Sequence, residues 1–272
     1  MLNVKDYLPL RLCLQTVFSR SDTLSSFEKL LRLLQELGFW GIELNLPDLD
    51  VLSPDNLAAM LGEYDLKLTY LATGAFAKAR SLSLSTSSEI SRISAVNGAL
   101  ENADYAAEMH AGIILGFFKG GPQADSATPE HFFCKSVSEL CARKKSGVPV
   151  LLEATNRRET CVVRTLDEAA SVCSAVENPD LRILPDTYHM FYEETDPRDS
   201  ILRYRNRIEN LHLSDDNRYF PGFGSIDFGE VFRFLQSIDY QGTLALEGNI
   251  RENLEADLIK STEALCRFAE KR

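Results

Sequence analysis

Four side chains able to bind a metal ion stand where short apolar runs of the sequence end. They are Glu153, Asp186, His212 and Glu247. Three carboxylates and one imidazole suit Mn²⁺, Mg²⁺ or Co²⁺ better than a thiolate zinc centre would. If the four gather without a cation, the carboxylates repel one another and their pKa values rise. A divalent cation resolves this conflict, so the four residues together predict a divalent-metal site.

Taken singly, each of these residues has an ordinary structural explanation. A Glu at the end of a strand is commonly a solvated loop residue, and a lone His is usually a hydrogen-bonded surface or core group. Their shared position at strand ends is what favours a site. Two of the remaining histidines lack that position, because His110 precedes a predicted strand and His131 lies within a predicted helix. We assign neither a role.

The elements that must position the four residues alternate regularly along the chain. A short β-branched or apolar run, a turn and an amphipathic stretch follow one another repeatedly. The predicted strands are 11–18, 41–44, 66–72, 112–115, 148–153, 181–185, 210–213 and 243–247. The predicted helices include 53–61, 89–110, 129–144, 165–176 and 197–205, and the first helix begins after Asp22 and ends at Gly38. Eight strands and eight helices are expected in all.

This alternation predicts an α/β fold with a parallel sheet, and 272 residues fit a single-domain (β/α)8 TIM barrel spanning residues 1–272. An open doubly wound sheet is the alternative. No G-x-G-x-x-G or Walker loop follows any strand, which argues against it. In such barrels the active site lies at the carboxyl ends of the strands, where the four candidate ligands stand. We expect the serine-rich segment Ser81–Ser88 to be a solvated loop rather than an active-site lid.

Composition narrows the choice of partners. A net charge of −11 without a Lys/Arg-rich stripe disfavours nucleic acid. No apolar run approaches the roughly 20 residues of a membrane span, and the N-terminus lacks the features of a signal peptide, so we expect no membrane partner and a cytoplasmic location. Six scattered cysteines without a C-x-x-C pair indicate reduced thiols rather than disulfides or a zinc module.

The residues around the strand ends form strings that resemble a known family. The strings are Glu153–Glu159, Asp186–Met190, His212–Arg218, Pro221–Phe228, Gly38–Glu43 and Tyr240–Gly242. They resemble the xylose-isomerase-like TIM barrels, which include sugar isomerases and epimerases, inositol-catabolic enzymes and apurinic endonucleases. Within that family the chain is most similar to ketose 3-epimerases of the tagatose and psicose type. It departs from them at Ala154, where those enzymes tend to carry Pro.

The resemblance implies a role for each site residue. The metal ligands would be Glu153, Asp186, His212 and Glu247, and the substrate contacts would be Glu159, His189 and Arg218. Glu153 and Glu247 would form the acid/base pair of an isomerase. They would remove a proton beside the carbonyl of a ketose or ketose phosphate, pass through an enediolate and invert a carbon, typically C3. The resemblance further implies one divalent ion, Mn²⁺ before Mg²⁺, Co²⁺ or Zn²⁺, and a homodimer.

Other activities fit the same fold. An aldose–ketose isomerase, or a hydroxypyruvate- or inosose-type isomerase or dehydratase, would use the same metal site. An apurinic endonuclease would need several more histidines and a basic face, which the chain lacks. A non-catalytic sugar-binding barrel would be marked by lost metal ligands, whereas all four are present.

For several residues near the predicted site we expect structural roles rather than catalytic ones. Glu43 ends a predicted strand and could reach the site, but we expect a solvated or supporting role. Trp40 is expected to pack. Arg218 and the loop Pro221–Gly224 follow strand seven, where many barrels bind phosphate, but two glycines favour a plain turn. Asp227, three residues before a Glu, is expected to cap a helix.

Overall fold

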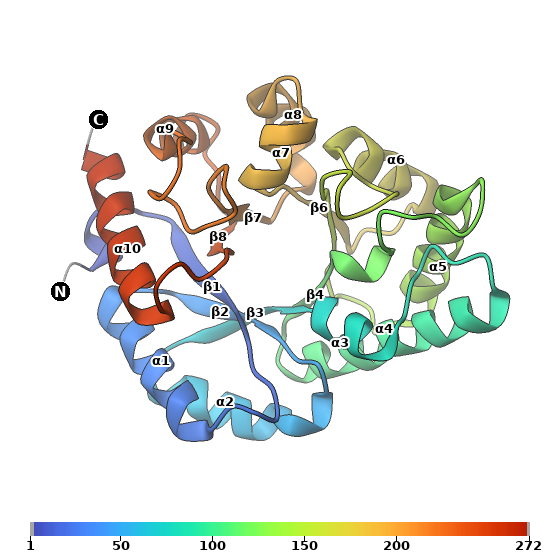
Figure 1. Ribbon diagram of the computed structural model, residues 1–272, viewed down its shortest axis with the longest axis horizontal. Helices are drawn as coiled ribbons and strands as arrows, with labels where there is room; N and C mark the ends of the chain where they lie inside the picture. Colours follow the sequence, from blue (N-terminus) through green and yellow to red (C-terminus); the bar gives the residue numbers. More distant parts are fainter. Residues whose placement is uncertain (1–2, 271–272) are drawn as a thin grey trace.

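Eight parallel strands form a nearly closed barrel in the structure, a computed structural model that describes residues 3–270. Figure 1 shows the helices arranged around the strands. The strands are β1 (Arg11–Val17), β2 (Gly41–Asn45), β3 (Lys67–Ala72), β4 (Gly112–Leu115), β5 (Val150–Glu153), β6 (Leu181–Leu184), β7 (Asn210–Leu213) and β8 (Thr243–Leu246). The predicted (β/α)8 barrel is confirmed.

The helices follow the strands in sequence. The α-helices are α1 (Leu24–Leu37), α2 (Pro54–Glu63), α3 (Gly74–Arg80), α4 (Glu89–Glu108), α5 (Pro129–Arg143), α6 (Leu166–Val176), α7 (Thr187–Glu193), α8 (Pro197–Tyr204), α9 (Phe228–Ser237) and α10 (Leu254–Glu270). Short 3₁₀ turns are η1 (Val4–Asp6), η2 (Leu49–Val51), η3 (Phe117–Lys119) and η4 (Arg205–Arg207).

The seam between β6 and β7 is where the barrel closes. The strands pair in the order β6-β5-β4-β3-β2-β1-β8-β7, so these two strands form the edges of the sheet. Two isolated parallel bridges join the edges, Ile183 with Ile208 and Asp186 with His212. The N–H of His212 donates to the carbonyl of Pro185 at 2.9 Å. Closure of the barrel therefore brings two of the candidate ligands side by side.

The short strands are covered on both faces. All four residues of β4, β5 and β8 are buried, as expected for a parallel sheet between a barrel interior and a layer of helices. Strand β7 is equally buried but alternates polar with apolar residues, Asn210 and His212 with two leucines. Because side chains along a strand alternate between its faces, Asn210 and His212 point to the same side.

Helix α1 shows how the outer layer is held. Thr23 caps its first turn by accepting from the N–H of Ser26 at 3.1 Å. Gly38 ends it in the left-handed conformation, with φ of 82°, which glycine adopts without a Cβ penalty. The residues that bury its inner face recur at helical spacing, Phe27, Leu31, Leu34 and Leu37.

The predicted strands are confirmed in number and order, with bounds that differ by at most two residues. The predicted eight helices were too few, because β3 and β6 are each followed by two helices within the described residues. Helices α3 and α7 were both missed. Each has only seven residues, too short for a clear apolar period. Helix α7 begins directly after Asp186, whose side chain caps it.

The prediction that Ser81–Ser88 is a solvated loop was wrong at its centre. Leu84 and Ser85 are buried. The N–H of Leu84 donates to the carbonyl of Phe118 at 3.0 Å, and its own carbonyl accepts from the hydroxyl of Ser136 at 2.7 Å. The segment thus packs between η3 and α5, a tertiary contact that its serine-rich composition does not reveal.

Two further features bear on the expectations from composition. All six cysteines carry free thiols, in agreement with the prediction of reduced cysteine, and four of them are buried. Between residues 3 and 270, no helix combines the length and the apolar character that a membrane span requires.

Replacing Gly41 with Ala should lower the free energy of unfolding by about 1–3 kcal/mol. A Cβ at this position would overlap the main-chain carbonyl oxygen of Lys67 on the paired strand β3, so the two strands would have to separate. Gly62 provides the control, because it is exposed in α2 and a Cβ there meets no atom within 4 Å. Gly62→Ala should raise stability by about 0.5–1 kcal/mol. Urea unfolding measures both, and equal stability of Gly41→Ala and the parent protein would contradict the spacing of β2 and β3.

Candidate metal centre

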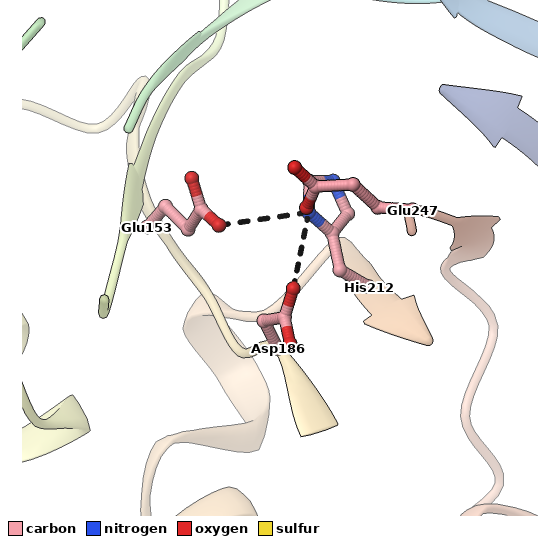
Figure 2. A group of neighbouring side chains, drawn as sticks. All are labelled: Glu153, Asp186, His212 and Glu247. Carbon is pink, nitrogen blue, oxygen red and sulfur yellow. Dashed lines mark hydrogen bonds and ion pairs between the residues drawn. The ribbon is translucent and has the colours of Figure 1, made fainter. Parts of the chain in front are cut away.

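The four candidate ligands meet at the carboxyl ends of β5 to β8. One ligand atom from each of Glu153, Asp186, His212 and Glu247 lies within 4.8 Å of the others. The Nδ1 atom of His212 lies 3.8 Å from a carboxylate oxygen of Glu153 and 3.8 Å from one of Asp186, and 2.7 Å from one of Glu247. Figure 2 shows the side chains converging on this point. A hard-oxygen set with one imidazole nitrogen could hold a divalent metal.

Strand geometry and local hydrogen bonds position these residues. Glu153 is the last residue of β5, and the N–H of Glu247 continues the β8 pairing by donating to the carbonyl of Leu213 at 3.2 Å. Asp186 uses its two oxygens differently. Oδ1 accepts from the N–H of Tyr188 at 2.7 Å and caps α7, which turns Oδ2 towards the other ligands.

Glu43 fixes the orientation of the His212 ring. It is fully buried at the centre of β2, so the expectation of a solvated side chain was wrong and that of a supporting one is confirmed. One of its oxygens lies 2.9 Å from Nε2 of His212 and 3.2 Å from the amide nitrogen of Gln15, and the other accepts from Asn210 at 2.5 Å. An N–H held on Nε2 leaves Nδ1 as the atom that faces the ligands.

Burial and opposite charges shift the pKa values of the site in different directions, so the rise expected for all three carboxylates occurs only at Asp186. Burial raises the pKa of Asp186. Burial also opposes ionisation of Glu153 and Glu247, but neighbouring imidazole and guanidinium groups outweigh it. The imidazoles of His189 and His212 hold the pKa of Glu153 well below its usual range, and Arg218 holds that of Glu247 at about 2. Burial disfavours the charged form of His212, yet Glu43 and Glu247 raise its pKa well above the ordinary value.

Arg218 contacts the candidate metal ligands more closely than the sequence predicted. Its guanidinium donates to Asp186 at 2.7 Å and to the hydroxyl of Ser214 at 3.0 Å, and it pairs with Glu247 at 2.8 Å. The guanidinium also lies 5.0 Å from the centre of the Tyr188 ring. Arg218 therefore neutralises two of the carboxylates while lining the cavity in front of them.

His189 directs an N–H group towards the cavity. The main-chain N–H of Asn156 and its side-chain amide both approach Nδ1 of His189, at 3.2 and 2.8 Å. The side-chain oxygen of Asn156 accepts from the N–H of Arg158 at 2.9 Å. The NH₂ group of the same amide must therefore face His189. Nδ1 is thus an acceptor and the proton sits on Nε2. That Nε2 is buried without a hydrogen-bond partner and lies 3.6 Å from Glu153.

A cavity of about 280 Å³ opens in front of the ligands. The predicted substrate residues Glu159, His189 and Arg218 all line it, together with Glu153 and Glu247. Glu159 is exposed, whereas His189 is buried. A larger depression of about 790 Å³ lies around Arg11, Trp40 and His110, and none of the four candidate ligands lines it. The chemistry of the residues therefore marks the smaller cavity as the candidate site.

Comparison with known proteins places the chain in a family. Residues 31–268 match the model of the xylose isomerase-like TIM barrel. The chain belongs to this family. The predicted resemblance is thereby confirmed.

Individual relatives share parts of the sequence or the whole fold. A D-psicose 3-epimerase of Enterocloster bolteae is 35% identical over 96 residues, 35% of this chain and 32% of that protein. A probable ketose 3-epimerase of Synechocystis sp. is 28% identical over 221 residues, 77% of this chain and 74% of that protein. The chain spans about a third to a half of the length of the first curated relatives it matches. The apo crystal structure of 3-keto-D-glucoside 4-epimerase from E. coli, 23% identical, shares the fold with a TM-score of 0.78 over 95% of this chain and 99% of that one.

In this xylose isomerase-like barrel the loop Pro221–Gly224 is a turn built around Asp215. The carboxylate of Asp215 is buried and accepts from the N–H groups of Gly222, Gly224 and Ile226 at 2.9, 2.8 and 3.0 Å. These amides are therefore not available to a phosphate group. The expectation of a plain turn is confirmed, as is the helix cap by Asp227, whose side chain accepts from the first turn of α9.

Replacing Glu43 with Gln should weaken Mn²⁺ binding by about 10- to 100-fold. In Gln an NH₂ group replaces one of the two carboxylate oxygens. Either His212 or Asn210, which both donate to Glu43, would then face a donor instead of an acceptor. Calorimetric titration of chelator-treated protein with Mn²⁺ measures the change. Glu139→Gln is the control, because Glu139 lies on α5, outside the candidate site. Its carboxylate pairs with Arg92 of α4 at 2.9 Å. Unchanged affinity in Glu43→Gln would show that Glu43 does not orient His212.

Proposed function

We propose that this chain is an isomerase, a divalent-metal-dependent epimerase that acts on a ketose or ketose phosphate. The observation that carries the proposal is the pair of carboxylates Glu153 and Glu247. They line one cavity together with His189 and Arg218, and they enter the site from opposite sides (Figure 2). Two acid/base groups on opposite sides of a carbon are what an inversion at that carbon requires.

The donor set supports a single divalent ion, for which we propose Mn²⁺. Glu153, Asp186, His212 and Glu247 would hold it, and Glu43 keeps the free nitrogen of His212 directed at it. When bound, such an ion supplies Lewis-acid stabilisation of negative charge on neighbouring sugar oxygens. The four residues fit this role because three buried or partly buried carboxylates lie close together and otherwise repel one another.

The chain's own residues divide the remaining work. One of Glu153 and Glu247 accepts the proton beside the carbonyl, and the other returns a proton to the opposite face of the enediolate. His189 donates its Nε2 hydrogen to a sugar oxygen, which satisfies an atom that has no hydrogen-bond partner in the described structure. Arg218 and the exposed Glu159 orient the hydroxyl groups from the cavity wall.

The relatives support an epimerase, but they differ in the carbon that is inverted. The names of the two curated relatives described above are those of 3-epimerases, and the E. coli structure is that of a 4-epimerase. We propose inversion at C3. The turn around Asp215 withholds its amides from phosphate, which favours an unphosphorylated sugar. The homodimer and the cytoplasmic location stay predictions.

Incubation of the chelator-treated protein with a panel of ketoses and ketose phosphates in deuterated water tests the proposal. With Mn²⁺ present, NMR should show a new epimer that carries deuterium at C3. Without Mn²⁺, neither should form. Deuterium at C1 or C2 with an aldose product would replace the proposal by an aldose–ketose isomerase, and deuterium at C4 by a 4-epimerase. Tight Mn²⁺ binding without exchange in any sugar would contradict the proposed reaction.

Glu153→Gln and Glu247→Gln should each lower kcat by about 10²- to 10⁴-fold at saturating Mn²⁺, because an amide can neither accept nor return the proton. The metal content of each variant, measured by mass spectrometry, separates loss of the base from loss of the ion. Glu209→Gln is the control, since Glu209 lines the larger depression and pairs with Arg182. Full activity of both Gln variants would exclude the two carboxylates as acid and base.

A further inference from the structure

Lys119 is a fully buried lysine beside the site, and the proposed function gives it no role. It ends the η3 turn, which follows β4. Its ammonium group donates to three oxygens, the main-chain carbonyl of Glu153, the hydroxyl of Thr155 at 2.9 Å and the carbonyl of Val163 at 3.1 Å. All three acceptors belong to the end of β5 or to the loop that follows it.

These contacts tie together the two ends of the β5–α6 loop, residues 154–165. Glu153 stands immediately before the loop, and Val163 lies two residues before Thr165, the cap of α6. The N–H of Thr155 also donates to the carbonyl of Val163, at 3.2 Å. The loop between these points carries Asn156, which orients His189, and Glu159, which lines the cavity. Lys119 therefore sits at the base of the segment that forms one wall of the site.

The backbone at Val163 needs such support. Its φ is 55°, in the left-handed region that a β-branched side chain rarely adopts. A strained conformation of this kind persists only where the surroundings hold it in place. The carbonyl of Val163 accepts both from Lys119 and from Thr155, and these two donors fix the peptide that would otherwise relax.

The η3 turn also packs against the Glu153 side chain. A Cβ on Gly116, the residue before the turn, would overlap a carboxylate oxygen of Glu153. The segment from Gly116 to Lys119 thus contacts Glu153 at two points, at the carboxylate and at the main-chain carbonyl. Both the side chain and the backbone of this candidate ligand depend on one short turn.

Burying the ammonium group of Lys119 costs desolvation free energy. Burial lowers the pKa of Lys119 to about 8. No carboxylate of residues 3–270 forms an ion pair with it, whereas the other buried lysine, Lys144, pairs with Asp180 at 2.5 Å. An apolar side chain would fill the same space without the desolvation cost. The three converging acceptors are what the lysine provides and an apolar residue would not.

We propose that Lys119 is a positioning residue, which fixes the β5–α6 loop to the turn after β4. In this way it places Glu153, Glu159 and Asn156, the residue that orients His189, for the reaction. This inference rests on the proposed function for its catalytic consequence. The structural part, a loop held by one ammonium group, can be measured without a substrate.

The test compares Lys119→Met with Lys144→Met, two buried lysines that lose their charge in the same fold. Both variants should melt at lower temperature than the parent. In Lys119→Met alone, amides of residues 154–165 should exchange with deuterium at least about tenfold faster, because the loop loses its anchor. Mn²⁺ affinity should fall about tenfold. With the substrate found above, kcat at saturating Mn²⁺ should fall about 10- to 100-fold, as expected for a misplaced acid/base group.

Thr155→Val is a milder second variant if Lys119→Met does not fold. It removes one of the three acceptors, and the same three quantities should change in the same direction by about threefold each. Unchanged loop exchange and Mn²⁺ affinity in a folded Lys119→Met or Thr155→Val variant would overturn the proposal, whatever the melting temperature. If the parent protein turns over no sugar, the proposed function fails, while loop exchange and Mn²⁺ affinity still decide the role of Lys119.

Discussion

The carboxylates of Glu43, Glu153, Asp186 and Glu247 lie within one group of contacts at the end of the barrel, and three of them are almost fully shielded from water. In such surroundings, like charges raise one another's free energy unless cations stand between them. His212 lies between Glu43 and Glu247, and Arg218 bridges Asp186 and Glu247. Even with His189, 3.6 Å from Glu153, two imidazoles and one guanidinium do not balance four carboxylates. The remaining negative charge is what makes the site suited to a divalent cation.

Strand ends, turns and buried side chains together hold the candidate ligands in place. The bridge between Asp186 and His212 closes the barrel and sets two ligands next to each other in the same step. Asp186 is held by the first turn of α7, and Glu153 by the turn that contains Lys119. Barrel closure therefore sets two of the candidate ligands, and a neighbouring helix or turn further holds Asp186 and Glu153. Acid/base chemistry at Glu153 and Glu247 would benefit from this, because misplaced groups lose much of their rate advantage.

The sequence predicted those features that depend on residue type and order along the chain. The strands read as short apolar runs, and a polar residue at the end of each of four neighbouring strands sufficed to predict the cluster. Features that depend on contacts across the barrel were missed or misjudged. Glu43 bonds His212, 169 positions away along the chain, and Lys119 meets acceptors between 34 and 44 positions away. Helix α7 was missed because its seven residues are too few for a clear apolar period, although Asp186 caps it. Leu84 is buried although serines surround it, because η3 and α5 cover it.

The most direct test of the metal centre is a crystal structure of the protein loaded with Mn²⁺, with diffraction data collected on both sides of the manganese absorption edge. We expect one strong anomalous peak, with Glu153, Asp186, Glu247 and the Nδ1 atom of His212 as its ligands. The Nε2 atom of His212 should keep its hydrogen bond to Glu43. A fully loaded crystal with no peak between these four residues, or with its peak elsewhere on the protein, would contradict the account.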